Sequence, residues 1–354
     1  MSGFEERIEK IRALIEAREL ESIVLRRNPN LAWAIAGRSH VATTIDSACF
    51  DLIVTRDSIT AVTNIIEAPR LIAEEFVPEI GVKIIDWWEN RDSLLPVGVK
   101  VGCDQPGFNR IDLGTEIEIL RATLVADDIK RFRIICSDAA IALGRAMREV
   151  SSSDREIDVA GKITKVLWES NLEISFLGVA GDSRVKSFRH PLPTTSLIGT
   201  RAVASICAKR KGLIASLTRI VTFGEVSESD HHNYMSLLNV EAELLNATVV
   251  GIAFSQPIKA VVDAYSANGF DVGEWKLHHQ GGPTGYLPRD WPATISSTRL
   301  IAQNQPIAWN PTGKGLKVED TVLTTADGLE ILSVDFTWPA VKSAGRLRPG
   351  LLQR

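Results

Sequence analysis

The chain is poor in cysteine and has no long apolar run. Its 354 residues include four cysteines, widely separated and each inside an apolar stretch: Cys49, Cys103, Cys136 and Cys207. This distribution favours buried free thiols in a reducing compartment over a disulfide framework. No run of 18 apolar residues occurs, and the acidic, amphipathic start MSGFEERIEKIRA is unlike a signal peptide. We therefore expect a cytoplasmic protein with no membrane partner.

An excess of charge of either sign is also lacking. The formal net charge is −4, which gives no electrostatic reason to expect nucleic acid as a partner. The hydrophobic content of 45% and charged content of 24% are typical of a globular protein, and the length favours two domains. These values therefore favour neither nucleic acid nor an anionic membrane surface as a partner.

The order of predicted elements indicates an α/β protein with two different halves. Strands and helices alternate over about the first 125 residues, which predicts a small α/β domain at 1–127. A long helix is expected over 129–150, and a capping-box match at 153–156 predicts a second helix behind it. We place an α+β domain at 128–342. The basic segment 343–354 contains two glycines and a proline and is expected to be a flexible tail.

The stretch from Arg201 to Gly224 predicts a β-hairpin at the centre of the second domain. Two apolar, β-branched runs flank Lys209–Gly212, which we take as the loop. In that register Ser205 lies directly opposite Ser216, and opposed residues hold their Cβ atoms about 4.5–5.5 Å apart. The two serines would then share one ligand, ion or water.

This hairpin resembles the central hairpin of the family that includes creatinase, aminopeptidase P, prolidase and methionine aminopeptidase. The catalytic half of that family has the pita-bread fold, and its metallopeptidases carry an aspartate at each of these two positions, bridging two divalent metals. Ser205 and Ser216 keep the spacing of eleven residues. Hydroxyls, however, are poor ligands for hard divalent cations. The resemblance implies a creatinase-like amino-terminal domain followed by a pita-bread domain, and the serines indicate a site without metals.

A glycine-rich segment, LHHQGGPTGY at 277–286, is the most unusual motif of the chain. Adjacent histidines on a strand point to opposite faces, so only one of His278 and His279 is expected to enter a site. The resemblance puts His279 at a metal-ligand position and Tyr286 near a position where the peptidases keep another histidine. The alternative is a glycine-rich turn with exposed imidazoles.

Two further positions correspond to metal-binding glutamates of the family. Asn310, in Trp309-Asn310-Pro311, stands where the first glutamate is expected, and Glu319 keeps the second. Of five family ligands only His279 and Glu319 remain, fewer than the three usual for a catalytic transition metal. We therefore expect no metal and no cofactor. Glu319 is predicted to be an acid/base group or to orient His279, and the alternative is a carboxylate at an exposed strand end.

Three other side chains complete the candidate set. His190, in Phe-Arg-His-Pro, is predicted to carry the proton, because an imidazole titrates near neutral pH; the alternative is a structural histidine before proline. Resemblance to creatinase implies that Arg38, close to His40, reaches into the pocket of a neighbouring subunit of a homodimer and binds a carboxylate; the alternative is a solvated surface turn. Arg219 is expected to form a structural ion pair or to hold Glu319 ionised.

These observations predict a metal-independent, creatinase-like hydrolase or lyase that cleaves a C–N or similar bond in a small carboxylate-bearing substrate. The predicted catalytic residues are His190, His279 and Glu319. The predicted substrate-binding residues are Arg38, His40, Ser205, Ser216, His278, Tyr286, Trp309 and Asn310. The alternatives are a non-catalytic pita-bread binding protein and a metal-dependent Xaa-Pro-type peptidase.

Overall fold

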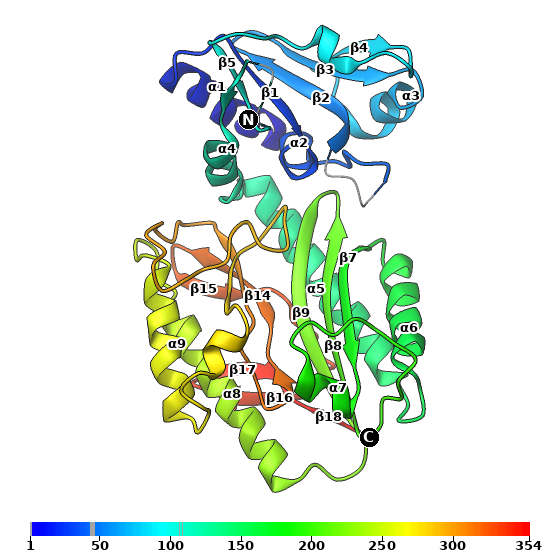
Figure 1. Cartoon of the computed structure of the whole chain (residues 1–354), viewed down its shortest axis with the longest axis vertical. Helices are drawn as coiled ribbons and strands as arrows, with labels where there is room; N and C mark the ends of the chain where they lie inside the picture. The colour runs from blue at the N-terminus through cyan, green and yellow to red at the C-terminus, as the bar shows by residue number, and fades with distance from the viewer. Residues whose placement is uncertain (1, 43–46, 106, 108) are drawn as a thin grey trace. The chain divides into compact units, whose positions relative to one another are not determined.

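The computed structural model describes residues 2–42, 47–105, 107 and 109–354. The chain divides into two compact units. The first runs to Ile129 and includes Lys211–Leu213, and the second comprises Lys130–Arg210 and Ile214–Arg354. Both units mix helices and strands, as the sequence predicts (Figure 1).

The first unit is built on a mixed six-stranded sheet in the order β4-β3-β2-β1-β5-β6. Strands β1, β2 and β3 are antiparallel neighbours, whereas β4, β5 and β6 pair in parallel. The elements are α1 (Gly3–Ala17), β1 (Ser22–Arg27), α2 (Asn28–Ile35), β2 (Ser47–Thr55), β3 (Ile59–Asn64), α3 (Ala68–Arg70), η1 (Leu71–Glu75), β4 (Gly81–Ile85), η2 (Arg91–Leu94), β5 (Val101–Cys103), β6 (Ile111–Asp112) and α4 (Gly114–Arg121). Helix α5 (Ala126–Arg148) follows.

Apolar side chains from the central strands and a few buried polar groups hold the first unit together. Val24, Ile53 and Val62, from three neighbouring strands, share one core cluster. Arg7 of α1 pairs with Asp128, and both side chains are almost fully buried. A buried ion pair of this kind is strongly destabilising to break, because the remaining charge has no partner.

The second unit contains two four-stranded sheets, ordered β18-β9-β8-β7 and β10-β11-β14-β15, and two short hairpins. Its further elements are α6 (Glu156–Glu169), β7 (Glu173–Ala180), α7 (Asp182–Ser187), β8 (Arg201–Arg210), β9 (Leu213–Thr222), α8 (Glu228–Ala247), α9 (Ser255–Ala267), η3 (Glu274–Leu277), β10 (Gly281–Pro283), β11 (Pro306–Trp309), β12 (Thr312–Gly313), β13 (Leu316–Lys317), β14 (Asp320–Thr325), β15 (Gly328–Ile331), β16 (Ala340–Ser343), β17 (Arg346–Pro349) and β18 (Leu352–Gln353). Helices α8 and α9 lie side by side (Figure 1), and their apolar faces share one core with strands of both sheets. The predicted central hairpin is the β8–β9 pair.

The hairpin differs from the prediction in its register. Its turn consists of two residues, Lys211 and Gly212, with φ of 46° and 85°, rather than the four residues expected. Positive φ at both turn positions matches the twist of the flanking strands, which favours two-residue turns of this type. The pairing is therefore shifted by two residues, so Ser205 contacts Thr218, and Ser216 contacts Cys207. Because side chains alternate with a period of two, the shift leaves both serines on the same face of the hairpin.

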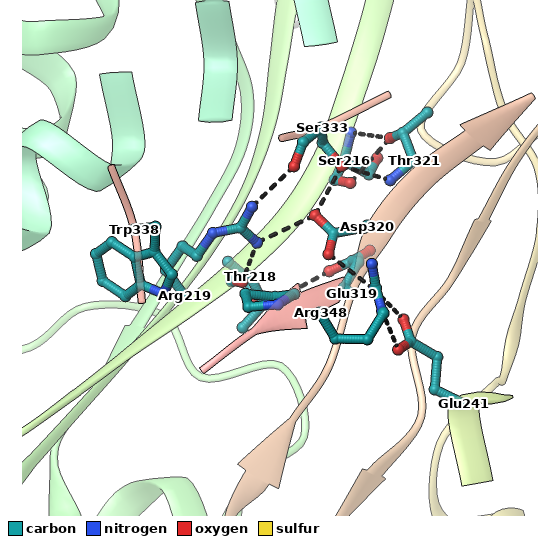
Figure 2. A network of polar contacts seen from close by, with 12 residues as sticks. Ser216, Thr218, Arg219, Glu241, Glu319, Asp320, Thr321, Ser333, Trp338 and Arg348 are labelled. Atoms are coloured by element: carbon teal, nitrogen blue, oxygen red, sulfur yellow. Dashed lines mark hydrogen bonds and ion pairs between the residues drawn. The ribbon is translucent and has the colours of Figure 1, made fainter. Parts of the chain in front are cut away.

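The prediction of a flexible carboxy-terminal tail is wrong. Residues 343–354 contribute to β16, β17 and β18, and β18 pairs in parallel with β9. Arg348 explains why this basic segment is fixed. Arg348 is 3% exposed, and its guanidinium donates to Glu241 and Asp320 (Figure 2). A basic segment is a solvated tail only when its cationic side chains form no ion pairs with buried carboxylates.

The predicted start of α6 is also displaced. Arg155 rather than Ser153 occupies the N-cap position, and Asp158 accepts from the Arg155 backbone N–H at 2.9 Å. Among the residues that the structure describes, no helix combines the length and the apolar character needed to cross a bilayer.

Candidate functional site

A cavity of about 500 Å³ lies in the second unit beside the central hairpin. Residues from several separate segments line it: Ser175, Phe176, His190, Cys207, His279, Pro288, Arg289, Asn310, Lys317 and Glu319. Five of the residues predicted from the sequence therefore lie in or directly beside this cavity, namely His190, His278, His279, Asn310 and Glu319. The volume is within the usual range for small-molecule sites.

Glu319 lies at the base of this cavity between two cationic side chains. Lys317 Nζ lies 2.8 Å from Glu319 Oε2, and Arg289 Nη2 donates to Oε1 at 2.8 Å. Thr218 Oγ1 donates to Oε2 at 3.0 Å. All three charged side chains are largely buried, with 4% of Glu319, 9% of Lys317 and 13% of Arg289 exposed. Both oxygens of the carboxylate are thus occupied by protein donors.

These contacts keep Glu319 ionised. Burial alone would raise the pKa of the carboxyl, but the charges of Lys317 and Arg289 and their hydrogen bonds outweigh it and lower the pKa to about 2. A carboxyl with so low a pKa is a poor proton donor or acceptor near pH 7. The prediction that Glu319 works as an acid/base group is therefore not supported, and its carboxylate binds Thr218, Arg289 and Lys317 rather than orienting His279. Its carboxylate instead holds two cations in place.

Three imidazoles meet beside this charged group. His278 Nε2 and His190 Nε2 are 2.9 Å apart, and the rings of His278 and His279 stack with centroids 4.5 Å apart. The ring centroids of His190 and His279 are 5.5 Å apart. Of the two adjacent histidines, His279 lines the cavity and His278 is buried beside it, in line with the prediction that one of them enters the site. The two residues precede β10, so their side chains do not alternate as on a regular strand. Both rings therefore approach His190.

The imidazoles are held in their neutral form. Burial, followed by the charge of Lys317, lowers the pKa of His278 to about 2. Burial, followed by the charge of Arg289, lowers the pKa of His279 to about 4, and burial followed by Lys317 lowers that of His190. In the His190–His278 hydrogen bond one Nε2 carries the proton and the other accepts it. His278 Nδ1 is buried with no hydrogen-bond partner.

The two serines lie behind Glu319. Ser205 Oγ is 2.7 Å from Thr218 Oγ1, so Ser205 reaches Glu319 only through Thr218. It lines a neighbouring cavity of about 20 Å³ rather than the large one. Ser216 Oγ lies 3.4 Å from Cys207 Sγ and 3.4 Å from Arg289 Nη1. The two hydroxyls do not share a ligand as predicted, because the shorter turn changes their partners.

Of the other predicted substrate-binding residues of this unit, Asn310 lines the cavity, whereas Trp309 and Tyr286 do not. Asn310 lines the cavity, and its Oδ1 is buried without a hydrogen-bond partner. Trp309 points into the core, where its Nε1 donates to Thr248, so its predicted contact with substrate is wrong. The Tyr286 hydroxyl accepts from Arg131 of α5 at 3.1 Å, and Tyr286 is not among the residues that line the cavity.

Arg38 and His40 belong to the first unit. Arg38 Nε donates to Glu75 Oε1 at 2.7 Å, and its Nη2 donates to Glu74 at 3.1 Å. His40 is half-buried in the same loop. The role of this loop in the pocket of a second subunit stays a prediction.

Arg219 forms the structural ion pair expected of it, but with the residue next to Glu319. Its Nη1 donates to Asp320 Oδ1 at 3.1 Å, and Ser333 Oγ donates to the same oxygen at 2.7 Å (Figure 2). Arg348 Nη2 donates to Asp320 Oδ2 at 2.8 Å. Asp320 and Glu319 thus have separate sets of partners, with Asp320 held in the buried network and Glu319 facing the cavity.

The residues present do not fit the two-metal centre that the fold family implies. Both oxygens of Glu319 are bound by protein donors, and the positions expected to carry carboxylates hold Ser205, Ser216 and Asn310. Carboxylates, rather than hydroxyls, are the usual ligands of hard divalent cations.

A second group of possible ligands is the imidazole cluster. The ligand nitrogens of His190, His278 and His279 all lie within 4.8 Å of one another. A tetrahedral zinc ion would need its nitrogen ligands about 3.4 Å apart, with their in-plane lone pairs converging. The rings of His278 and His279 instead stack at an interplanar angle of 28°, so these lone pairs run side by side. The composition of the cluster suits a transition metal, whereas its geometry and the adjacent cations Lys317 and Arg289 do not.

Sequence reasoning missed the two cations of the site. Lys317 lies two residues before Glu319, a spacing that places both side chains on one face of an extended segment, so their pairing had a detectable signal. Arg289 had none, because the loop that follows β10 brings it to Glu319 only through the fold.

Known proteins resemble this chain in sequence and in structure over nearly its whole length. No protein-family model matches the chain. An Xaa-Pro dipeptidase of Pyrococcus horikoshii is 20% identical over 94% of this chain and 98% of its own length. A crystal structure of a prolidase from Thermococcus sibiricus matches all of both chains with a TM-score of 0.79 and 17% identity. The amino-terminal domain of the FACT complex subunit SPT16 from chickpea matches 94% of this chain with a TM-score of 0.72 and 10% identity.

The structural matches establish the fold, and the sequence match extends across both units. The chain matches the prolidase structures over nearly its whole length, so the match includes both the amino-terminal α/β unit and the pita-bread unit. We conclude that the chain has the pita-bread fold of the prolidase structures and is similar in sequence to Xaa-Pro dipeptidases over nearly its whole length.

Proposed function

We propose that this chain is a hydrolase that cleaves an amide or similar C–N bond in a small, carboxylate-bearing, dipeptide-like substrate. One observation carries the proposal: a 500 Å³ cavity brings neutral imidazoles next to a buried Glu319 flanked by Lys317 and Arg289. Titratable groups with strongly shifted pKa values in a cleft are typical of functional sites. The peptidase names of the relatives support the same reaction class.

In this proposal His190 is the proton carrier. It lies at the open side of the cavity as a neutral imidazole, and His278 fixes its ring through the Nε2–Nε2 contact of 2.9 Å. His190 would take a proton from a water molecule as its oxygen attacks the substrate carbonyl carbon. It would then return the proton to the nitrogen that leaves, so the elements of one water molecule are added across the broken bond. Asn310 Oδ1, which lacks a protein partner, is a suitable acceptor for a substrate N–H.

A metal-dependent Xaa-Pro dipeptidase is the second candidate. It is favoured by the relatives of that name, of which one matches almost the entire chain. The comparisons support this reaction class more strongly than a creatinase-like reaction, whereas the ligand positions 205, 216 and 310 do not favour its metal pair. The two candidates differ in their expected response to metal ions and to a chelator.

The test is an assay of dipeptide hydrolysis with Xaa-Pro and non-proline dipeptides. Each substrate is measured with added Mn²⁺ and with a chelator. We expect His190→Ala to lower kcat by roughly a hundredfold or more, as loss of a general base does. The matched control is His232→Ala, which removes an exposed imidazole from the first turn of α8 and should leave kcat unchanged.

Each outcome has a definite meaning. Chelator-insensitive hydrolysis that depends on His190 supports the proposal. Hydrolysis of Xaa-Pro dipeptides that requires added Mn²⁺ supports the second candidate. Unchanged turnover in His190→Ala contradicts the role of His190, and failure of the wild-type protein to hydrolyse any dipeptide contradicts both candidates.

A further inference from the structure

A second cavity, of about 350 Å³, lies in the second unit beside the short hairpin formed by β16 and β17. Most of the side chains that line it are apolar, among them Ile331, Val334, Trp338 and Leu347. Its lining residues are different from those of the 500 Å³ cavity, so it is a separate site. A benzene molecule fits a cavity of about 150 Å³, so an aromatic side chain has ample room here.

The charged residues that line this second cavity are two arginines and two aspartates, whose charges cancel. Arg219 and Arg348 both donate to Asp320 (Figure 2). The fourth, Asp335, pairs through Oδ2 with Arg148 of α5 at 3.0 Å. Because these charges are already paired, the cavity does not attract an ion, and an apolar group can enter it without leaving a charge unpaired.

The rim of the cavity carries a projecting aromatic ring. Phe336 is 95% exposed, the largest exposed fraction among the large apolar side chains that the structure describes. Both of its flanks are fixed, because Asp335 Oδ1 accepts from the Thr337 backbone N–H at 2.8 Å and the buried Trp338 donates through Nε1 to the Gly350 carbonyl at 2.9 Å. The ring is therefore held out in solvent by an ordered segment, where it is costly unless another surface covers it.

The exposed apolar surface continues from this rim onto α5. Leu347, which also lines the cavity, is 70% exposed. On α5, Gly144 packs directly against Asp335, and Ile141 lies one turn before it with half of its surface exposed. Ile134, a further seven residues back on the same face of the helix, is also exposed. Exposed apolar side chains gathered around a hollow are typical of an interaction surface.

We propose that this surface binds a second copy of the chain, with Phe336 of each protomer inserted into the 350 Å³ cavity of the other. A two-fold contact brings the same patch of both copies together, so the patch must be complementary to itself. Here the projecting ring and the apolar hollow lie side by side on one patch, which meets that requirement. A small molecule in the cavity would leave the outward ring uncovered.

This contact does not depend on the proposed reaction. It is also separate from the contact predicted for Arg38, which belongs to the first unit. The fixed flanks of Phe336 mean that little freedom is lost when the two copies meet, which favours affinity.

Photo-cross-linking of the full-length protein tests the placement of the ring. Phe336 is replaced by p-benzoyl-L-phenylalanine, and chains of natural and of ¹⁵N-enriched isotope composition are mixed before irradiation. Mass spectrometry should find position 336 of one isotope form joined to residues 338–349 of the other, because the ring lies in the cavity of the second copy. Cross-links confined to one isotope form, or none, would overturn the proposal.

Sedimentation equilibrium measures the energy of the contact. Phe336→Ser should weaken self-association at least about a hundredfold, because one substitution removes a buried aromatic anchor from both copies. Phe336→Trp keeps an aromatic ring and should retain most of the association. The control is Val272→Ser, which changes a side chain that is 76% exposed elsewhere in the second unit and should have no effect.

The outcomes are distinct because Phe336 is exposed, so its replacement should leave the fold intact, as circular dichroism can establish. A monomeric wild-type protein would overturn the proposal. So would an association that Phe336→Ser leaves unchanged, including one that disappears in Arg38→Ala instead. A small molecule retained by the wild type in native mass spectrometry and lost in Leu347→Trp, a variant that fills the cavity, would assign the cavity to that ligand and overturn the dimer contact.

Discussion

Replacing Asp320 with asparagine should remove a large part of the stability of the second unit. Asp320 accepts three hydrogen bonds, from Arg219 at 3.1 Å, from Ser333 at 2.7 Å and from Arg348 at 2.8 Å. The Asp320, Arg219 and Arg348 side chains are at most 2% exposed. Asp320→Asn preserves the size of the side chain. It leaves two buried guanidinium groups, those of Arg219 and Arg348, and a single carboxylate, Glu241, which binds Arg348.

The magnitude follows from burial rather than from the number of bonds. Breaking a buried ion pair by removing one partner costs about 3–5 kcal/mol. The asparagine retains one acceptor oxygen, but its amide N–H groups face a donor on Arg348, so we expect the loss to stay in this range. That is a large share of the 5–15 kcal/mol that stabilises a typical domain.

Urea unfolding followed by tryptophan fluorescence measures this effect. With an m-value of about 3 kcal/mol/M, the transition of the second unit should move down by roughly 1–1.7 M urea. The control is Asp327→Asn in the exposed β14–β15 turn, which should change the free energy of unfolding by less than about 0.5 kcal/mol. If Asp320→Asn behaves like this control, the network does not contribute as its burial implies.

Two further predictions concern the ends of elements in the second unit. Deleting residues 343–354 should lower the melting temperature and expose the core to protease. The deletion removes the partner of Glu241, Arg348, and the strand that pairs with β9, β18. An unchanged melting temperature and digestion pattern would restore the prediction of a flexible tail. The hydrogen bonds from Arg155 lower the pKa of Asp158 from 3.8 to about 2, so the pair stabilises the fold fully above pH 3.8 and loses its contribution as the pH falls through about 2. The difference in melting temperature between the wild type and Asp158→Asn should therefore shrink as the pH falls below about 4, and a constant difference would contradict this assignment.

The local patterns of the chain were sufficient for the fold. The sequence predicted a long helix over 129–150 and a second helix behind the capping-box match, and the β-branched runs around Lys211 predicted the central hairpin. The alternation of side chains placed Ser205 and Ser216 on one face even though the predicted register was shifted by two residues. These features depend on neighbours close in sequence, and a period of two or of 3.6 residues survives small errors in turn length.

The cavity beside the central hairpin depends on contacts between distant segments, and the sequence identified only part of it. His190 and Glu319 were recognised because their motifs resemble those of a known family. The sequence alone therefore determined the two-unit α/β architecture and most of the candidate histidines. Only the tertiary structure showed that the ionised carboxylate of Glu319 forms ion pairs with Lys317 and Arg289. Whether a carboxylate binds a metal, a proton or a cationic side chain depends on which charges the fold brings within about 3 Å of it.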